Sequence, residues 1–133
     1  LFLQPHGPRK RLHATWPILV NEGFRESAAG RAAFDAWARV TDAVEGSSLA
    51  FVARGMNQLD LRKRLGQIRA PVLVISGERD RLFSAEHGQE IAQRIAGSSF
   101  ASIPGAGHLS NLDTPDQFNR LLLEFLAANF PVQ

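Results

Sequence analysis

The sequence predicts an α/β protein whose second half is a strand–helix–strand–helix unit with two parallel strands. Residues 72–75, Val-Leu-Val-Ile, form a continuous apolar run, which is typical of a strand covered on both faces. Residues 99–103 form a second short strand, and an amphipathic helical pattern follows each of the two strands. This alternation predicts a parallel pair joined by a right-handed crossover helix. The first half of the chain is predicted to be helical.

Several helices are expected before the first strand. Residues 27–45 carry apolar side chains at helical spacing, and Gly46 is of a type that commonly ends a helix. Shorter helices are predicted over residues 49–56 and 59–68. Three prolines are expected to interrupt the beginning of the chain, namely Pro5, Pro8 and Pro17. We expect the aromatic side chains of this half to be packing residues: Trp16, Phe34, Trp37 and Phe51.

The helices of the second half have recognisable ends. Ser84 is suited to cap the first of them, and Gly97 is suited to end it. Thr114 is expected to cap the last helix, with Pro115 in its first turn and Gln117 closing a capping box. Apolar residues then recur at intervals of three and four, which predicts one buried stripe: Phe118, Leu121, Leu122, Phe125 and Leu126.

Composition narrows the class of protein. The 133 residues suffice for one domain with a core, and 44% hydrophobic and 21% charged residues are ordinary for a globular protein. A net charge of +2 and two short basic runs, residues 9–11 and 62–64, argue against a nucleic-acid partner. The absence of cysteine excludes disulfides, thiol nucleophiles and cysteine metal sites, and suits a cytoplasmic protein. No other cluster has the spacing of metal ligands, and neither a membrane span nor a signal peptide is expected.

Two titratable residues follow the ends of the two predicted strands. Asp80 lies just beyond the first strand, and His108 just beyond the second. Parallel strands end at the same edge of a sheet and neighbouring strands lie about 4.8 Å apart, so the two loops should be close in space. The carboxyl edge is also where open α/β sheets bind ligands. We therefore expect Asp80 and His108 to form a pair.

Such a pair has a defined chemistry. A carboxylate bonded to one ring nitrogen fixes the histidine tautomer, and the other nitrogen can then act as a general base towards a nucleophile. Asp113 and Asp116 also lie near His108, but we expect them to be surface or helix-start residues, since Asp116 suits a helix dipole. The other histidines are expected to be ordinary surface residues: His6, His13 and His87.

The segments "PVLVISGERD" (71–80) and "IPGAGHLSNLDTPDQFNRLLLEFL" (103–126) resemble the C-terminal end of the α/β-hydrolase fold. That family has a G-x-x-D turn, matched here by Gly77 and Asp80, and a later G-H, matched by Gly107 and His108. Within the family the second segment is most similar to the 3-oxoadipate enol-lactonase group. The resemblance implies that residues 1–58 are a helical lid and residues 59–133 the C-terminal part of the core.

The nucleophile that this resemblance implies is not evident in the chain. A G-x-S-x-G turn after an apolar strand is required, and the nearest match is "GSSLA" (46–50), which nominates Ser48. The match is poor because a helical pattern precedes it and Ala50 replaces the last glycine. We therefore expect the nucleophile to lie outside this chain, so that the chain alone is inactive.

Only two strands can be found, and a sheet of this size leaves backbone edges open. We expect the chain to be cut from a longer protein, to pair with a separate N-terminal hydrolase core, or to self-associate through its exposed strand edge.

The expected activity is hydrolysis of a small-molecule ester or lactone without a cofactor. Asp80 and His108 would supply the acid and the histidine of a serine-type triad, and Phe83 and Leu109 are candidates for lining the substrate pocket. Two alternatives remain open. One is a dehalogenase or C–C bond hydrolase built on the same frame, and the other is a non-catalytic binding or assembly module that retains the fold.

Overall fold

A computed structural model describes residues 7–43, 51–52, 54–56 and 58–131. The described residues fall into two compact units, one drawn from residues 1–17 and 22–60 and the other from residues 18–21 and 61–133. The boundary expected from the sequence lies between residues 58 and 59. Among the described residues, no helix combines the length and the hydrophobicity that a membrane crossing requires.

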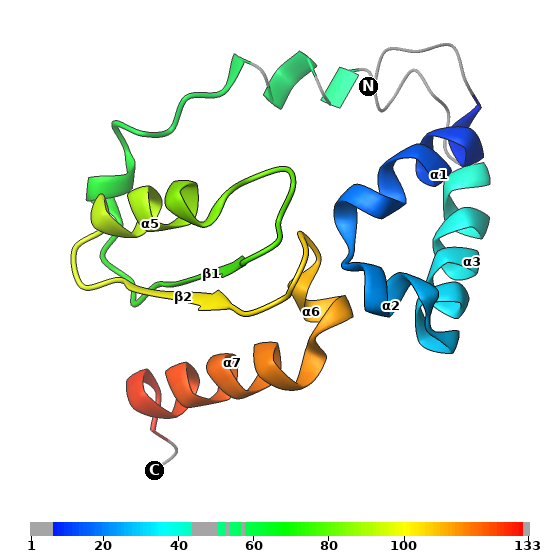
Figure 1. The fold of residues 1–133 in the computed structure, drawn as a ribbon. Helices are drawn as coiled ribbons and strands as arrows, with labels where there is room; N and C mark the ends of the chain where they lie inside the picture. Colours follow the sequence, from blue (N-terminus) through cyan, green and yellow to red (C-terminus); the bar gives the residue numbers. More distant parts are fainter. Residues whose placement is uncertain (1–6, 44–50, 53, 57, 132–133) are drawn as a thin grey trace. The chain divides into compact units, whose positions relative to one another are not determined.

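The first unit is helical (Figure 1). It contains helices α2 (Glu22–Glu26) and α3 (Ala28–Asp42) and most of α1 (Pro8–Leu19), whose last two residues belong to the second unit. The expectation that prolines interrupt this region is wrong for two of them, because Pro8 begins α1 and Pro17 lies within it. A proline in the first turn loses no helical hydrogen bond, and Pro17 lies so near the end of α1 that little helix follows it. Pro5 lies outside the described residues.

Helix α3 confirms the predicted helix but is shorter than expected. Ser27 caps it by accepting a hydrogen bond of 2.9 Å from the backbone N–H of Gly30. The helix ends at Asp42 with Ala43 as its C-cap, so Gly46, which lies outside the described residues, does not end it. Of the helix predicted over residues 49–56, the described part, residues 51–52 and 54–56, is helical.

Trp16 is the centre of aromatic packing in this unit. Its side chain is buried, and its ring centroid lies 5.6 Å from that of Phe34 and 5.8 Å from that of Trp37. Both pairs have the edge-to-face arrangement that aromatic rings prefer. Phe51 was expected to pack but is 81% exposed, so that prediction is wrong.

The segment before the first strand also departs from expectation. Residues 59–68 were predicted to form a helix, but the structure has a turn followed by a short 3₁₀ helix, η1 (Leu65–Gln67). Gly66 disfavours a longer helix because glycine gives up the most backbone freedom on becoming helical.

The second unit confirms the predicted strand–helix–strand–helix order. Strands β1 (Leu73–Gly77) and β2 (Ser99–Ile103) pair in parallel, with Leu73 opposite Ser99 and Gly77 opposite Ile103. Figure 1 shows α5 (Ala85–Gln93) over one face of this sheet and α7 (Pro115–Asn129) over the other. The two strands are therefore covered on both faces, as their apolar sequence indicates.

The predicted capping side chains do not cap. Ser84 and Thr114 occupy the N-cap positions of α5 and α7, but neither side chain accepts a hydrogen bond from a backbone N–H of its helix. The Thr114 hydroxyl instead donates to the carbonyl oxygen of Ser110 at 2.8 Å. This bond belongs to an additional short helix, α6 (Ser110–Asp113), which the sequence did not predict.

Candidate active site

The ends of β1 and β2 are tied together by their following loops. Gly77 and Ile103 are opposite each other in the sheet. Beyond Gly77, the chain is hydrogen-bonded to the end of β2 and to the loop that follows it. The N–H of Glu78 donates to Ile103 at 3.0 Å, and the N–H of Arg79 donates to Ala106 at 2.8 Å. The loops that carry Asp80 and His108 are therefore held in contact by backbone bonds.

Gly77 is required for this close approach. A Cβ atom at this position would overlap the carbonyl oxygen of Gly107 and would come within 2.6 Å of that of Ala106. Both partner atoms belong to the backbone and cannot move aside as a flexible side chain would. The glycine of the G-x-x-D turn thus makes room for the loop that carries the histidine.

Asp80 and His108 form a hydrogen-bonded pair at this edge of the sheet. Nδ1 of His108 lies 2.9 Å from Oδ2 of Asp80, although the residues are 28 positions apart in the sequence. The other carboxylate oxygen of Asp80 accepts the backbone N–H groups of Leu82 at 2.8 Å and Phe83 at 3.0 Å. Both oxygens of the carboxylate are therefore engaged, which fixes its orientation.

The electrostatics of the site favour an ionised Asp80. Burial of its side chain, which is 8% exposed, raises the pKa of this carboxyl. The N–H of Phe83, the ring of His108 and the N–H of Leu82 act in the opposite direction, and together they leave the pKa of Asp80 below its ordinary value. The pair thus consists of a charged acceptor beside an imidazole.

His108 presents its second ring nitrogen away from this carboxylate. No other protein group in the described part of the chain bonds to the ring through Nε2. The side chain is 28% exposed, and the ring of Phe83 lies 5.7 Å from it, centroid to centroid. An imidazole held at Nδ1 and open at Nε2 can accept a proton from a hydroxyl group.

Asp113 does not fit its predicted role. It was expected to be a surface or helix-start residue, but it is buried, and its Oδ2 accepts the N–H groups of Gly107 and Asn21. It is therefore not a second acid for His108. Asp116 is exposed in the first turn of α7, as the sequence predicts. One feature of the sequence bears on Asp113. The chain must turn between His108 and the helix that begins at Pro115, and Asp113 lies in this connection.

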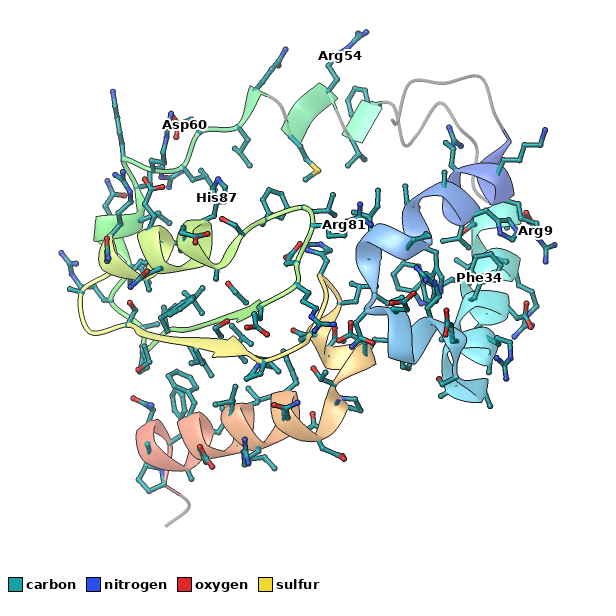
Figure 2. The ribbon with its side chains drawn as sticks, in the orientation of Figure 1. Arg9, Phe34, Arg54, Asp60, Arg81 and His87 are labelled. Carbon is teal, nitrogen blue, oxygen red and sulfur yellow. The ribbon has the colours of Figure 1, made fainter. Side chains whose placement is uncertain are left out.

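Among the described residues, neither of the other candidate histidines is hydrogen-bonded to this pair. His13 is exposed and packs on Phe34, and His87 is exposed on α5 beside Ser84, with Nδ1 of His87 3.1 Å from the serine hydroxyl. Figure 2 labels His87 on α5 and Arg81 on the loop after β1. Ser48 and His6 lie outside the described residues. Within the described ranges, no group of three or more acidic or histidine side chains is placed to hold a metal ion.

A comparison with known protein families shows the family to which this chain belongs. The model of a family described as "Alpha/beta hydrolase family" matches residues 1–121. The chain belongs to the alpha/beta hydrolase family. Strands β1 and β2 with helices α5 and α7 are accordingly the C-terminal part of an α/β-hydrolase fold, as the sequence predicts.

Individual hydrolases are similar over parts of this chain. The 2-hydroxy-6-oxo-6-phenylhexa-2,4-dienoate hydrolase of Burkholderia cepacia is 37% identical over 68 residues, which are 51% of this chain and 24% of the relative. The solved structure of the enol-lactonase from Burkholderia xenovorans LB400 has a TM-score of 0.83 and 26% identity, covering 92% of this α/β-hydrolase chain and 46% of that one.

A hydrolase from Pseudomonas aeruginosa PA01 has a TM-score of 0.80 and 30% identity, covering 94% of this chain and 46% of that one. The chain thus spans about a quarter of the length of the curated relatives at the top of the comparison and just under half of these solved structures. By their names, these three similar proteins are an enol-lactonase and two hydrolases.

Proposed function

We propose that this chain supplies the acid and the histidine of a serine-type α/β-hydrolase that cleaves a small ester or lactone. The observation that carries the proposal is the 2.9 Å bond between Nδ1 of His108 and Oδ2 of Asp80. Asp80 orients the ring and stabilises the imidazolium, while His108 acts first as general base and then as general acid.

The proposed reaction has two stages. Nε2 of His108 takes the proton of a serine hydroxyl, and the serine oxygen attacks the carbonyl carbon of the substrate. The bond to the alcohol oxygen then breaks, and Nε2 returns the proton to that oxygen, leaving an acyl-enzyme. Nε2 then takes a proton from water, and the water oxygen attacks the acyl carbon. The bond to the serine oxygen breaks, and Nε2 returns the proton to that oxygen, so that the acid and the free serine are released. In a lactone, the alcohol and the acid remain parts of one opened molecule.

We propose that the nucleophilic serine does not belong to residues 1–133. Ser48 has the right place in the chain order but a poor sequence context, and it lies outside the described residues. We therefore propose that the reaction requires an N-terminal core carrying the serine, in the same polypeptide or a partner chain. The 46% coverage of the enol-lactonase structure supports this proposal.

The substrate would enter beside the exposed part of His108. Phe83 lies against the imidazole ring and is 56% exposed, and Leu109 directly follows His108. We propose that these two apolar side chains line the pocket and that residues 1–58 serve as the lid. A Phe83→Ala variant should raise KM for an aromatic ester more than it lowers kcat.

A second candidate function is hydrolysis of a carbon–carbon bond on the same frame. It is favoured by the 37% identity to the hydrolase of 2-hydroxy-6-oxo-6-phenylhexa-2,4-dienoate, since that substrate contains no ester or lactone. A non-catalytic module of this fold is a third candidate, and it predicts no reaction with any of these substrates.

The deciding experiment uses the full-length product of the gene with a fluorophosphonate probe, which labels an activated serine. We expect labelling of the wild-type protein and its loss in His108→Ala, because the serine then lacks its base. The exposed His87 provides the matched control, and His87→Ala should label normally. Undiminished labelling of His108→Ala would remove this residue from the mechanism.

Substrate class is then resolved by comparing three probes: p-nitrophenyl acetate, a small lactone and a 2-hydroxy-6-oxohexa-2,4-dienoate. Turnover of the first two supports the ester and lactone proposal. Turnover of the dienoate alone supports the C–C hydrolase. A folded protein that reacts with neither the probe nor any substrate supports the binding module.

A further inference from the structure

Asp113 is a buried acid that the proposed reaction does not use directly. It lies at the end of α6 with only 9% of its surface exposed. Its Oδ2 accepts two backbone hydrogen bonds, 2.9 Å from the N–H of Gly107 and 2.8 Å from the N–H of Asn21. One carboxylate oxygen thus joins two segments that are far apart in the sequence.

The first of these segments carries the proposed general base. Gly107 directly precedes His108, so the bond from its N–H to Asp113 fixes the peptide that leads into the histidine. On the other side of His108, the N–H of Leu109 donates to the carbonyl oxygen of Leu19 at 2.8 Å. The backbone of His108 is therefore held on both sides, and Asp113 provides the only side chain among these contacts.

Gly107 is packed closely against Asp113 and against the backbone of Asn21. A Cβ atom on Gly107 would lie 2.8 Å from Oδ2 of Asp113 and 2.9 Å from the backbone nitrogen of Asn21. Hydrogen bonds from backbone N–H groups to a carboxylate are charge-assisted and stronger than those between neutral groups. Removing the carboxylate would deprive the buried N–H of Gly107 and the part-buried N–H of Asn21 of this acceptor and release the loop before His108.

We propose that Asp113 is a positioning residue, which holds the His108 loop so that the imidazole meets Asp80. It acts through Gly107 and touches neither the reacting atoms nor the Asp80 side chain in this proposal. The catalytic consequence rests on the proposed function, whereas the effect on the orientation of the ring does not.

The first test reads the His108 ring itself by nitrogen-15 NMR of the histidine-labelled full-length gene product, with His108→Gln assigning the signal. We expect the wild-type ring to carry its proton on Nδ1, bonded to Asp80. Asp113→Ala should convert this signal to a mixture of the two tautomers, whereas Asp113→Asn, which retains an acceptor oxygen, should largely keep it. The exposed Asp116 lies three residues away, and Asp116→Ala is the matched control with an unchanged signal.

The second test measures turnover of p-nitrophenyl acetate. A misplacement of about 1 Å can cost about 100-fold in rate, so kcat should fall by about that factor in Asp113→Ala with little change in KM. Asp113→Asn should lose about tenfold, since an amide oxygen is a weaker acceptor than a carboxylate.

The outcomes separate the two proposals. A folded Asp113→Ala variant with the wild-type tautomer and kcat would overturn the positioning role. If Asp113→Ala fails to fold, Asp113→Asn decides, and an unchanged kcat and ring signal in that variant would overturn it equally. A wild-type protein that turns over no substrate would refute the proposed function, while the ring signal would still test the role of Asp113.

Discussion

His108 and Asp80 are joined by a 2.9 Å hydrogen bond between Nδ1 and Oδ2, and the other oxygen of Asp80 holds the N–H groups of Leu82 and Phe83. The loop after β1 thus orients the acid, and the acid orients the histidine on the loop after β2. Backbone hydrogen bonds join the two loops, so the pair is held at the edge where the two strands end.

Replacing Asp80 by asparagine should abolish most of the catalysis. The amide would favour donation to Nδ1, so the proton of a neutral His108 would move to Nε2 and block the base. We expect kcat to fall by about 10⁴-fold, as it does when the acid of a Ser-His-Asp triad is changed in this way. Steady-state hydrolysis of p-nitrophenyl acetate by the full-length gene product measures it. Asp116→Asn is the control, and a loss in Asp80→Asn of under tenfold would contradict the assignment.

The stability of the protein should depend on the ionisation of Asp80. The ordinary pKa of the group is 3.8 and its folded value is lower, so the folded state favours the ionised form. This stabilisation is complete above the unfolded pKa, and it is lost as the pH falls from about 3.8 through the folded pKa.

Urea unfolding of the wild type and Asp80→Asn between pH 7 and pH 2.5 tests this dependence. At neutral pH the variant should be less stable by about 1.5 kcal/mol, the size of a hydrogen bond to a charged group. The difference should shrink once the pH falls below about 3.8. A difference that stays constant over the whole range would show that Asp80 titrates normally.

Gly77→Ala should destabilise the edge of the sheet. Its Cβ atom would overlap the carbonyl oxygen of Gly107, and forcing an extra carbon into a packed site costs about 1–3 kcal/mol. Gly66→Ala is the matched control, because the nearest atom to its Cβ, the carbonyl oxygen of Arg94, would be an ordinary 3.7 Å away. Equal unfolding free energies for the two variants in urea would argue against a tight contact at Gly77.

Trp16→Ala should destabilise the helical unit more than Trp37→Ala. Trp16 is 4% exposed, whereas Trp37 is 42% exposed. Truncating a buried tryptophan typically costs about 3–5 kcal/mol through lost burial and the cavity left behind. Thermal unfolding followed by near-ultraviolet circular dichroism compares the two variants. A larger loss for Trp37→Ala would reverse the assignment of the core.

Local pattern was sufficient to predict the second half of the chain. The apolar run before Gly77 and the stripe that begins at Phe118 each express the periodicity of one element, so they can be read without knowing the partners. The proximity of Asp80 and His108 also followed, because parallel neighbouring strands necessarily end at one edge.

The predictions that were wrong concern features that depend on neighbouring parts of the structure as well as on the local sequence. Ser84 and Thr114 were placed correctly as N-cap residues, but whether a hydroxyl caps a helix depends on competing acceptors, and Thr114 bonds to Ser110 instead. The helix predicted over residues 59–68 was equally a matter of context, since residues that favour helices fill most of this segment and the structure nevertheless has a turn and a 3₁₀ helix there.

The sequence by itself determined the α/β class, the order of the strands and helices in the second half, and the edge at which an acid and a histidine meet. Only the tertiary structure decided that Asp113 is buried and bound to Gly107 and Asn21. The physical reason is distance along the chain: Asn21 is 92 residues from Asp113, and no local periodicity reports a hydrogen bond over that separation.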